Sequence, residues 1–552
     1  MKEKFSITNK NEASLYSTSS ESKTLELFSH PEKDFSLLQL EQQISDNISL
    51  FLKKHSLSGE KFPKELETLF KNSTIPTKPK SVSSQTKFIL DKVVPQSINV
   101  SSSSFVGHMS TVLPYFMLPL AKIMIALNQN LVKIETSKAF TPLERETIAK
   151  LHRLFFNFSS RFYDRYIQDR SSCLGVMCSG GTLSNLTALW VARNNLLCET
   201  EGFGGVNKEG LHRALMYYGY TDAVIITSEL GHYSLKKSAD ILGIGRNNLI
   251  GIEVDSKFKM KPTVLEKTLI QLEKNRIAPI AVVAVGGTTE TGSVDRLEEI
   301  ADICSTHNIH MHVDAAWGGP CIFSKKHSHL LSGIERADSI GIDAHKQLYC
   351  PIGSGIVLFK NPASSSNIKF NANYIIRKNS RDLGKYSVEG SRSGMSLLVH
   401  SALNIISRSG YETLIDRSIK LAKDFASLIS KSKNFELVTS PELNILTYRF
   451  IPTNIIEKLN RYLDHQDKVK VTGINFYLNE LTQYIQKTQR ENKNSFVSRT
   501  SIKVAKYFNQ DITVLRVVLS NPMTTTETLQ SILEEQTQIA STYKKKFEPN
   551  SK

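Results

Sequence analysis

The chain has 552 residues, of which 40% are hydrophobic and 22% charged. That is enough apolar sequence for a large buried core and more than one domain. The formal net charge is +16, and a basic balance of this size admits nucleic acid or an acidic membrane surface as a partner. The basic residues are scattered, with only a short run at Lys544–Lys546. We therefore interpret them as a solvated surface and expect no nucleic-acid partner.

The cysteines and the apolar segments indicate the compartment. Six cysteines are present and none belongs to a C-x-x-C pair, which favours reduced thiols in a cytoplasmic protein over a disulfide framework or a metal site. Residues 1–5 have no apolar signal-peptide core. The longest apolar stretch, 112–127, is broken by Pro114, Pro119 and Lys122, so it is too short to span a membrane. We expect a cytoplasmic protein without a membrane partner.

Residues 1–100 form an N-terminal extension that is rich in Ser, Lys and Glu. Two amphipathic pieces, 35–52 and 64–70, precede a loop marked by Pro76 and Pro79. After residue 101 the chain contains an apolar helix, predicted at 118–131. A second helix is predicted at 143–156, with Pro142 near its first turn.

From residue 174 onward, apolar runs of strand length alternate with amphipathic helical stretches. The runs are 174–178, 223–227, 249–254, 280–285, 309–313, 339–342 and 355–359. They are almost continuously apolar, as strands buried on both faces are. Helices predicted at 184–196, 262–274 and 296–306 separate several of them. The pattern predicts an α/β domain at 101–395, with a seven-stranded, mostly parallel sheet covered by helices.

A small α+β domain is predicted at 396–552. It begins with a helix at 396–407 and contains strand-like runs at 435–438, 445–450 and 514–519. The stretch 452–509 between these runs is polar, and we interpret it as helix plus a surface insertion. The sequence shows no internal repeats.

The stretch Asp343-Ala-His-Lys-Gln-Leu-Tyr349 carries the strongest chemical signal. Lys346 follows a predicted strand and would project into the interior, where desolvation lowers the pKa of a lysine and makes it an amine nucleophile. Asp314, followed by Ala315 and Ala316, ends the preceding predicted strand. This order suits pyridoxal 5′-phosphate (PLP), because the carboxylate keeps the pyridine nitrogen protonated, Ala316 packs on the ring and the lysine binds it covalently.

With these motifs the chain resembles the PLP-dependent group II amino-acid decarboxylases over about residues 101–523. Within that family it looks most similar to the bacterial aspartate 1-decarboxylases. The resemblance implies the fold-type I architecture and a homodimer in which the N-terminal extension wraps around the partner subunit. A partly disordered tail is the alternative interpretation of residues 1–100.

Several cofactor contacts follow from the motifs and the resemblance. The turn Ser179-Gly-Gly-Thr182 opens a predicted helix, whose N-terminus offers unpaired N–H groups to a phosphate. The resemblance places Gly181 and Thr182 on the phosphate of PLP, with His345 helping to hold it. It also implies that His232 stacks on the pyridine ring and acts in catalysis, and that Thr289 lies beside the cofactor.

The resemblance further assigns residues to the substrate. Tyr374 would deliver the proton to the α-carbon from a mobile loop. Arg392, flanked by Gly and Ser, would meet the α-carboxylate through its planar guanidinium. The polar residues His108 and Ser110, in the segment 105–111, suit a second carboxylate on the substrate side chain.

These expectations favour decarboxylation of a small acidic amino acid. The first candidate is L-aspartate, giving β-alanine for pantothenate synthesis, and the second is L-glutamate, giving 4-aminobutanoate. A lyase or desulfurase on the same scaffold is a third possibility, which the Tyr374 loop and the 105–111 segment disfavour. A non-catalytic basic binding protein is the alternative from another class, and the intact His232, Asp314 and Lys346 disfavour it.

Overall fold

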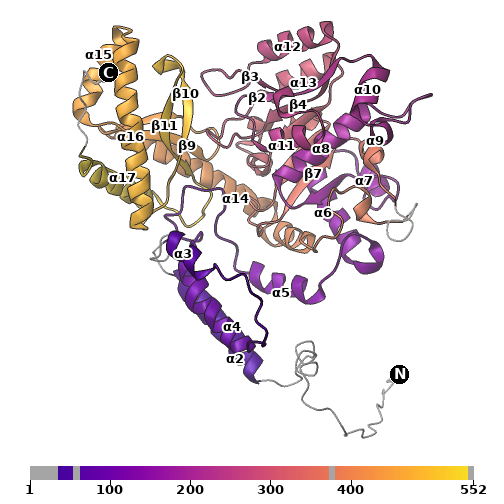
Figure 1. Ribbon diagram of the computed structural model, residues 1–552, viewed down its shortest axis with the longest axis horizontal. Helices are drawn as coiled ribbons and strands as arrows, with labels where there is room; N and C mark the ends of the chain where they lie inside the picture. The colour runs from indigo at the N-terminus through magenta and orange to yellow at the C-terminus, as the bar shows by residue number, and fades with distance from the viewer. Residues whose placement is uncertain (1–34, 54–56, 58–62, 372–379, 545–552) are drawn as a thin grey trace. The chain divides into compact units, whose positions relative to one another are not determined.

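A computed structural model describes residues 35–53, 57, 63–371 and 380–544 of the chain. The described residues fall into two compact units, one containing 35–53 and 63–97 and the other containing 57, 98–371 and 380–544. The first unit contains helices α2 (Phe35–Lys53), α3 (Pro63–Leu69) and α4 (Val82–Phe88), followed by a π-helical turn, Ile89–Val93 (Figure 1). The Oγ atom of Ser81 caps α4 by accepting a hydrogen bond from the Ser84 amide.

The second unit is built around a seven-stranded sheet. Its strands are β1 (Gly175–Cys178), β2 (Asp222–Ser228), β3 (Leu249–Ile252), β4 (Ile277–Val285), β5 (Met311–Asp314), β6 (Ser339–Asp343) and β7 (Gly355–Phe359). They are arranged in the order β1-β7-β6-β5-β4-β2-β3. Strand β7 pairs antiparallel with both of its neighbours, and the other pairings are parallel. The predicted fold class is therefore confirmed.

Both faces of this sheet are buried, which explains the uninterrupted apolar runs. In β4, Val282 and Ala284 contribute to one hydrophobic cluster, whereas Ala281 and Val283 contribute to another. Successive side chains of a strand point to opposite faces, so each face of β4 packs against its own layer of helices.

Helices surround the sheet on both sides (Figure 1). The helices of this domain are α5 (Met117–Leu127), α6 (Phe140–Phe156), α7 (Ser160–Tyr166), α8 (Gly181–Leu196), α9 (Val206–Glu209), α10 (Leu211–Tyr218), α11 (Ser234–Ile241), α12 (Pro262–Lys274) and α13 (Leu297–Thr306). Helix α8 crosses the sheet and contacts β1, β7, β6, β5 and β4. Helix α5 is shorter than predicted, because Asn128 adopts a left-handed conformation (φ 42°) that ends it.

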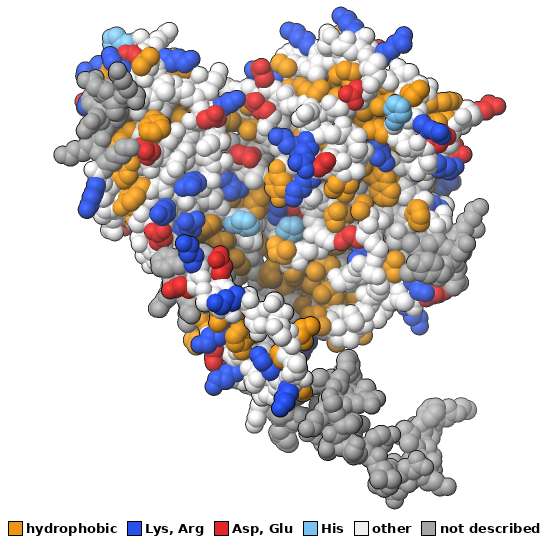
Figure 2. All heavy atoms as spheres, in the orientation of Figure 1, with side chains coloured by type: hydrophobic (Ala, Val, Ile, Leu, Met, Phe, Trp, Pro, Cys, Tyr) orange, Lys and Arg blue, Asp and Glu red, His pale blue; other side chains and the backbone are white. Residues whose placement is uncertain are grey.

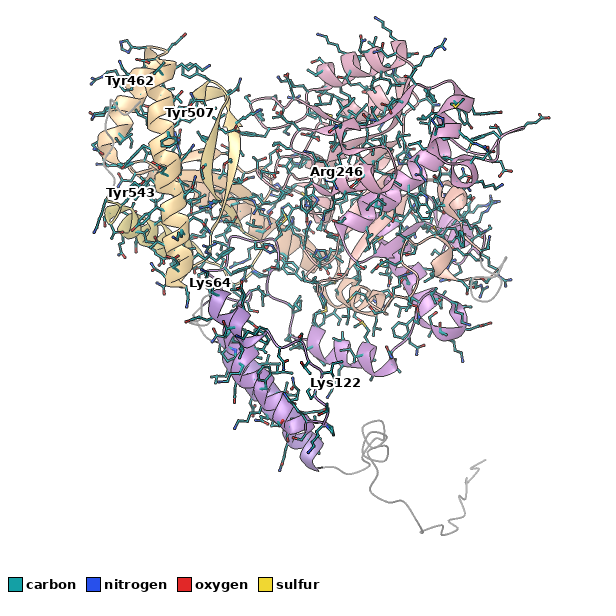
Figure 3. All side chains as sticks on the ribbon, viewed as in Figure 1. Lys64, Lys122, Arg246, Tyr462, Tyr507 and Tyr543 are labelled. Atoms are coloured by element: carbon teal, nitrogen blue, oxygen red, sulfur yellow. The ribbon has the colours of Figure 1, made fainter. Side chains whose placement is uncertain are left out.

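The chain leaves the large sheet through the long helical segment α14 (Ser396–Lys431), which is interrupted at Ser407 by a non-helical φ of 65°. A four-stranded antiparallel sheet follows, in the order β10-β11-β9-β8. Its strands are β8 (Phe435–Thr439), β9 (Ile445–Phe450), β10 (Ser498–Val504) and β11 (Gln510–Val518), and helices α15 (Thr453–Asp464), α16 (Lys468–Asn492) and α17 (Thr526–Ser541) accompany it. Figure 3 marks this region with Tyr462, Tyr507 and Tyr543.

For the stretch 452–509 the sequence predicted helix plus a surface insertion; the structure has the helices α15 and α16 there, and the stretch is an integral part of the domain. Helix α16 buries Val471, Ile474, Leu478 and Leu481 in the core of the small domain. Its opposite face is polar, and that polarity produced the prediction of a surface segment.

The basic residues do not form a single patch on the face shown in Figure 2. Blue Lys and Arg side chains are distributed there among acidic, apolar and neutral ones. Within the described ranges, the helices contain no segment with the length and hydropathy needed to cross a bilayer.

Candidate active site

A cavity of about 340 Å³ lies where the carboxyl ends of the parallel strands meet. Residues at the ends of β4, β5 and β6 and in the segments that follow β1, β2, β4, β5 and β6 line it. They are Ser179 to Leu183 and Asn185; Leu230 and His232; Val285, Gly287 and Thr289; Asp314, Ala316 and Trp317; and Asp343, His345 and Lys346. This edge of an open α/β sheet is the usual position of a ligand site. The structure thus brings together the eight residues that the sequence assigned to cofactor contacts.

The turn between β1 and α8 supplies the anion-binding end of the cavity. Ser179, Gly180, Gly181 and Thr182 line it, and α8 begins at Gly181, so the first amides of a 16-residue helix face the cavity. A β-carbon on Gly355 would lie 2.6 Å from the Gly180 α-carbon. Strand β7 and the turn therefore approach each other at a distance that only glycine permits.

Asp314 is a buried carboxylate that neighbouring groups hold in a fixed orientation. Its side chain is 6% exposed. Oδ2 accepts a hydrogen bond from Asn185 Nδ2 at 2.8 Å, and Oδ1 accepts one from the Ala316 amide at 3.2 Å. The carbonyl oxygen of the Asn185 side chain lies 3.0 Å from His312 Nε2. Burial lowers the pKa of His312 to about 4, so this imidazole is neutral and donates to Asn185.

The sequence analysis did not identify Asn185 or His312. Asn185 lies within the amphipathic pattern of α8 and His312 within an apolar strand. The available signal was their polarity at positions that the pattern predicts to be buried, since a buried polar group requires a partner.

Lys346 extends into the cavity from the turn after β6. Its Nζ atom lies 2.9 Å from Asp343 Oδ2, and the side chains of Lys346 and Asp343 are 17% and 3% exposed. His345 lies 3.7 Å from the same carboxylate oxygen and close to Gly180 of the anion-binding turn. The strand end thus places an amine in the lining of the cavity and an imidazole beside its anion-binding turn.

His232 lines the cavity from the loop that follows β2. Its Nδ1 atom lies 2.8 Å from Ser234 Oγ, which fixes the orientation of the ring. Burial is the main cause that lowers the pKa of His232, and the positive charge of Lys346 adds to it, whereas Asp314 acts in the opposite direction. A neutral aromatic ring therefore faces the space between Asp314 and Lys346.

Arg516, on β11 of the small domain, is a charged residue near this site that the sequence analysis missed. It is 8% exposed, and its Nε atom donates to the carbonyl oxygen of Thr289 at 2.6 Å. Nη1 is 3.1 Å from Ser498 Oγ, whereas Nη2 has no hydrogen-bond partner among the described residues. Burial lowers the pKa of Arg516 to about 10, with Glu290 acting against that change. The guanidinium stays charged at neutral pH and can donate hydrogen bonds to a carboxylate, although Arg516 is not itself among the residues that line the cavity.

His108 lies near the same positive charges, although neither His108 nor Ser110 is among the cavity-lining residues. Solvent reaches the His108 side chain, and its Nδ1 atom lies 2.8 Å from Ser110 Oγ. Partial burial lowers the pKa of His108, and the charges of Arg516 and Lys346 lower it further. A neutral His108 next to Arg516 is suited to donate a hydrogen bond to an anionic ligand.

The segment that carries His108 is attached to the small domain. The Val106 amide donates to the Phe496 carbonyl oxygen at 3.0 Å, and the Val518 amide donates to the Val106 carbonyl oxygen at 2.7 Å. Phe105 stacks on Phe496 with 5.0 Å between ring centroids. These contacts hold the 105–110 segment beside β11 and therefore beside Arg516.

Arg392 occupies a different place from the one that the sequence predicted. Its Nη1 and Nη2 atoms donate to the two carboxylate oxygens of Glu144 at 2.8 and 2.5 Å. The two side chains are 9% and 1% exposed, and Arg392 is not among the residues that line the cavity. The structure assigns its guanidinium to a buried ion pair with α6, so we do not retain the predicted substrate contact. Tyr374, predicted to donate the proton, lies outside the described residues.

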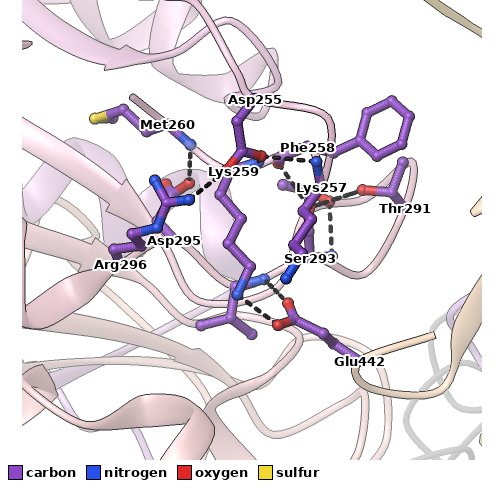
Figure 4. Close-up of polar contacts among 12 residues, drawn as sticks. Asp255, Lys257, Phe258, Lys259, Met260, Thr291, Ser293, Asp295, Arg296 and Glu442 are labelled. Atoms are coloured by element: carbon purple, nitrogen blue, oxygen red, sulfur yellow. Dashed lines mark hydrogen bonds and ion pairs between the residues drawn. The ribbon is translucent and has the colours of Figure 1, made fainter. Parts of the chain in front are cut away.

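A polar network fixes the loop that carries Thr289 (Figure 4). Glu442, in the turn between β8 and β9, accepts hydrogen bonds from Lys259 Nζ at 2.5 Å and from the Val294 amide at 3.0 Å. Asp295 accepts from the amides of Met260 and Val285 at 2.7 and 2.8 Å. Through Glu442 the small domain thus contacts the segment that follows Thr289, and Asp295 ties the same segment to β4 and to Met260.

A family model, the pyridoxal-dependent decarboxylase conserved domain, matches residues 63–451. The chain belongs to the pyridoxal-dependent decarboxylase family. It is 50% identical over 518 residues to an aspartate 1-decarboxylase of Aliivibrio fischeri, covering 94% of each chain. It is also 30% identical over 370 residues to the acidic amino acid decarboxylase GADL1 of Bos taurus, covering 66% of each.

Solved structures share the fold. Mouse CSAD in its apo form aligns with a TM-score of 0.77 and 23% identity, covering 92% of this chain and 99% of that one. The glutamate decarboxylase domain of a Vibrio parahaemolyticus diaminobutyrate enzyme aligns with a TM-score of 0.77 and 20% identity, covering 95% and 100%. At these identities the likeness describes the architecture alone.

The cavity of this decarboxylase fits PLP. Asp314 is a buried carboxylate with no ion-pair partner among the described residues, and a protonated pyridine nitrogen would supply the missing positive charge. The α8 N-terminus suits the phosphate, and Lys346 supplies the amine. When bound, the cofactor acts as an electron sink for the bond that breaks at the α-carbon.

Proposed function

We propose that this pyridoxal-dependent decarboxylase converts L-aspartate to β-alanine and CO2. The observation that carries the proposal is the 50% identity over 94% of both chains to an enzyme named aspartate 1-decarboxylase. A second relative, 32% identical over 318 residues, is named an L-aspartate decarboxylase of Metarhizium robertsii. The product would supply a pathway that consumes β-alanine, such as pantothenate synthesis.

In this proposal, Lys346 binds the cofactor, Asp314 pairs with the ring nitrogen and His232 covers the ring face. Gly181, Thr182 and His345 hold the phosphate, and Thr289 and Ala316 flank the ring. Tyr374 donates a proton to the α-carbon after CO2 leaves.

Arg516 is the residue that we propose for binding a carboxylate of the substrate. It combines a full positive charge, a buried position and a free Nη2 donor beside Thr289, which is what planar recognition of a carboxylate requires. His108, whose Nδ1 atom is hydrogen-bonded to Ser110, donates a hydrogen bond to the second carboxylate of an acidic substrate. An aromatic substrate would place an apolar ring against these polar groups at a desolvation cost.

L-Glutamate remains the second candidate, because it differs from aspartate by one methylene and such a difference is worth only about 1–3 kcal/mol in a pocket. The test is a comparison of kcat/KM for aspartate, glutamate, tyrosine and DOPA under one condition. We expect aspartate to have the largest value. A preference for glutamate would change the choice between the acids, and a preference for an aromatic substrate would contradict the acidic pocket.

We also propose that the enzyme is a homodimer. Helix α5 contains one charged residue in eleven, and four of its apolar side chains, Leu118, Ile123, Ile125 and Leu127, are 49–70% exposed. A helix of this composition is expected to be covered, and a second copy of the chain is its expected occupant, since most soluble oligomers are symmetric homo-oligomers. Ile125→Glu should therefore give monomers in sedimentation analysis, whereas Met216→Glu, at an exposed site on α10, should not. An active wild-type monomer would contradict the proposal.

The cysteines support a cytoplasmic location. All six are free, and five of them are buried, as expected of a protein that works in a reducing compartment. The scattered basic side chains leave the prediction of no nucleic-acid partner in place, and binding assays with duplex DNA and RNA at physiological salt would test it.

A further inference from the structure

A second, much smaller cavity lies away from the active site, between α6, β1 and the segment 383–392. Its polar lining consists of Glu144, Arg145, Cys173, Tyr386 and Arg392. The other residues that line it are mainly apolar. Its volume is about 10 Å³, enough for one water-sized occupant and too little for a tetrahedral oxyanion.

Arg145 presents unsatisfied donors to this region. The residue is 5% exposed. Its Nη1 atom donates to the carbonyl oxygen of Asp169 at 2.6 Å, whereas Nε and Nη2 have no hydrogen-bond partner within the described chain. The Tyr386 hydroxyl, on a side chain that is 1% exposed, likewise has no partner there. A guanidinium and a hydroxyl with free donor capacity therefore line one small cavity.

The nearby charges leave Arg145 without a counter-ion among the described residues. Arg392 is neutralised by Glu144 through two hydrogen bonds. Lys385 is 1% exposed, and the negative charge of the Asp382 carboxylate stabilises its positive charge. Arg392 and Lys385 thus each have a carboxylate as electrostatic neighbour, whereas Arg145 has no ion-pair partner among the described residues.

Other described residues around the cavity do not supply this partner. The Asp169 carboxylate accepts hydrogen bonds from the hydroxyl groups of Ser171 and Ser172 and forms no ion pair with Arg145 in the part of the chain that the structure describes. Lys369 adds a further positive charge that acts on Lys385.

An uncompensated charge in a buried site costs several kcal/mol unless an opposite charge is supplied. A water molecule would satisfy the donors but would leave the charge. We propose that this cavity binds a monatomic anion, chloride in the cell, held by the Arg145 guanidinium and the Tyr386 hydroxyl. The anion would connect α6 to the segment 383–392 and so stabilise the fold next to β1.

Bromide tests the site directly, because it replaces chloride and scatters X-rays anomalously. Crystals of the full-length holoenzyme grown with bromide should show an anomalous peak within hydrogen-bonding distance of Arg145 and Tyr386. A peak-free cavity that contains only a water molecule would overturn the proposal.

Solution measurements provide an independent test. The melting temperature of the holoenzyme should rise saturably with sodium chloride or bromide, compared with sodium gluconate at equal ionic strength. Arg145→Met removes the charge with a side chain of similar length, and this variant should lose the halide response. Tyr386→Phe should require higher halide concentrations for the same rise. It keeps the proposal testable if Arg145→Met does not fold.

The matched control is Arg213→Met on α10, where the arginine side chain is 73% exposed. This variant should keep the full halide response of the wild type. A halide response that persists in Arg145→Met, or that is equally lost in Arg213→Met, would contradict the assignment of the site.

Discussion

The Nε atom of Arg516 donates a hydrogen bond to the carbonyl oxygen of Thr289 at 2.6 Å. This contact joins the small domain to the loop at the end of β4, and Thr289 is a residue of the active-site cavity. The guanidinium is consequently held in place by the backbone of one domain while its Nη2 atom stays available. The contact therefore connects the small domain to a residue of the active-site cavity, and Glu442 of the small domain contacts the segment that follows Thr289.

Substitution of Arg516 should impair the reaction without removing the cofactor. We expect Arg516→Met to lower kcat/KM for aspartate by two to three orders of magnitude, since a desolvated charge pair of this kind is worth about 2–5 kcal/mol. Arg516→Lys keeps the charge but loses the planar donor pair, and it should recover only part of the activity. The visible spectrum of the bound cofactor should remain. Wild-type kcat/KM in Arg516→Met would contradict the role.

Arg392 provides a contrasting prediction, because its partner is Glu144 and not the substrate. Arg392→Met leaves the Glu144 carboxylate buried and uncompensated, which should destabilise the protein by about 3–5 kcal/mol. Denaturant unfolding of the holoenzyme would measure this loss. The double variant Arg392→Met, Glu144→Gln should regain part of the stability, since the buried charge is then absent. A stable Arg392→Met variant with a raised KM would return Arg392 to the substrate site.

Lys346 should carry the cofactor covalently. Borohydride reduction of the holoenzyme, followed by peptide mapping, should place the pyridoxyl group on Lys346, because this lysine lines the cavity and its amine lies beside Asp343. Lys385, which is also buried but lies outside the cavity, is the internal control and should remain unmodified. Labelling at any lysine other than Lys346 would refute the assignment.

The large domain could be predicted from the sequence because burial on both faces produces long apolar runs. In the small domain, strand β10 (Ser498–Val504) was not predicted, because it lies at the edge of the four-stranded sheet and its side chains are mostly polar or partly exposed. The runs that were identified gave the positions of Asp314 and Lys346 at strand ends. Their closeness then followed from the parallel arrangement of the strands.

The two arginines show what local sequence did not reveal. Arg392 stands among glycines and serines, a setting that suggests an open ligand contact, but its partner on α6 lies 248 residues away. Arg516 stands in the apolar run 514–519 and was counted as part of a core strand. A lone charge within such a run was the available signal, because burial requires a compensating group.

Tyr374 should be needed for proton transfer and not for cofactor binding. This prediction depends on the sequence motif, because the residue lies outside the described ranges. Tyr374→Phe should keep the cofactor absorption and the spectral change on adding aspartate, while amine formation falls by about two to four orders of magnitude. A side reaction that yields an aldehyde should increase. Normal turnover in Tyr374→Phe would exclude the role.

His152 should make the stability of the protein depend on pH. It is fully buried, with Nε2 3.0 Å from the Phe359 carbonyl oxygen and Nδ1 3.0 Å from the Tyr163 hydroxyl. In the neutral ring, Nε2 donates to the carbonyl oxygen and Nδ1 accepts from the tyrosine hydroxyl. Burial lowers the pKa of His152 from 6.5 to about 4, so below pH 6.5 the unfolded chain binds a proton that the folded chain does not.

The stabilising contribution of neutral His152 is therefore complete above its unfolded pKa and decreases as the pH falls toward the folded value. The slope should be about 1.4 kcal/mol per pH unit from this residue. Denaturant midpoints measured near about pH 7, 6 and 5 should decline, and His152→Gln, which lacks a titrating group, should decline less steeply. His212→Gln, at an exposed position on α10, is the matched control and should follow the wild type. Equal slopes in the wild type and His152→Gln would show that this imidazole does not contribute to the acid sensitivity.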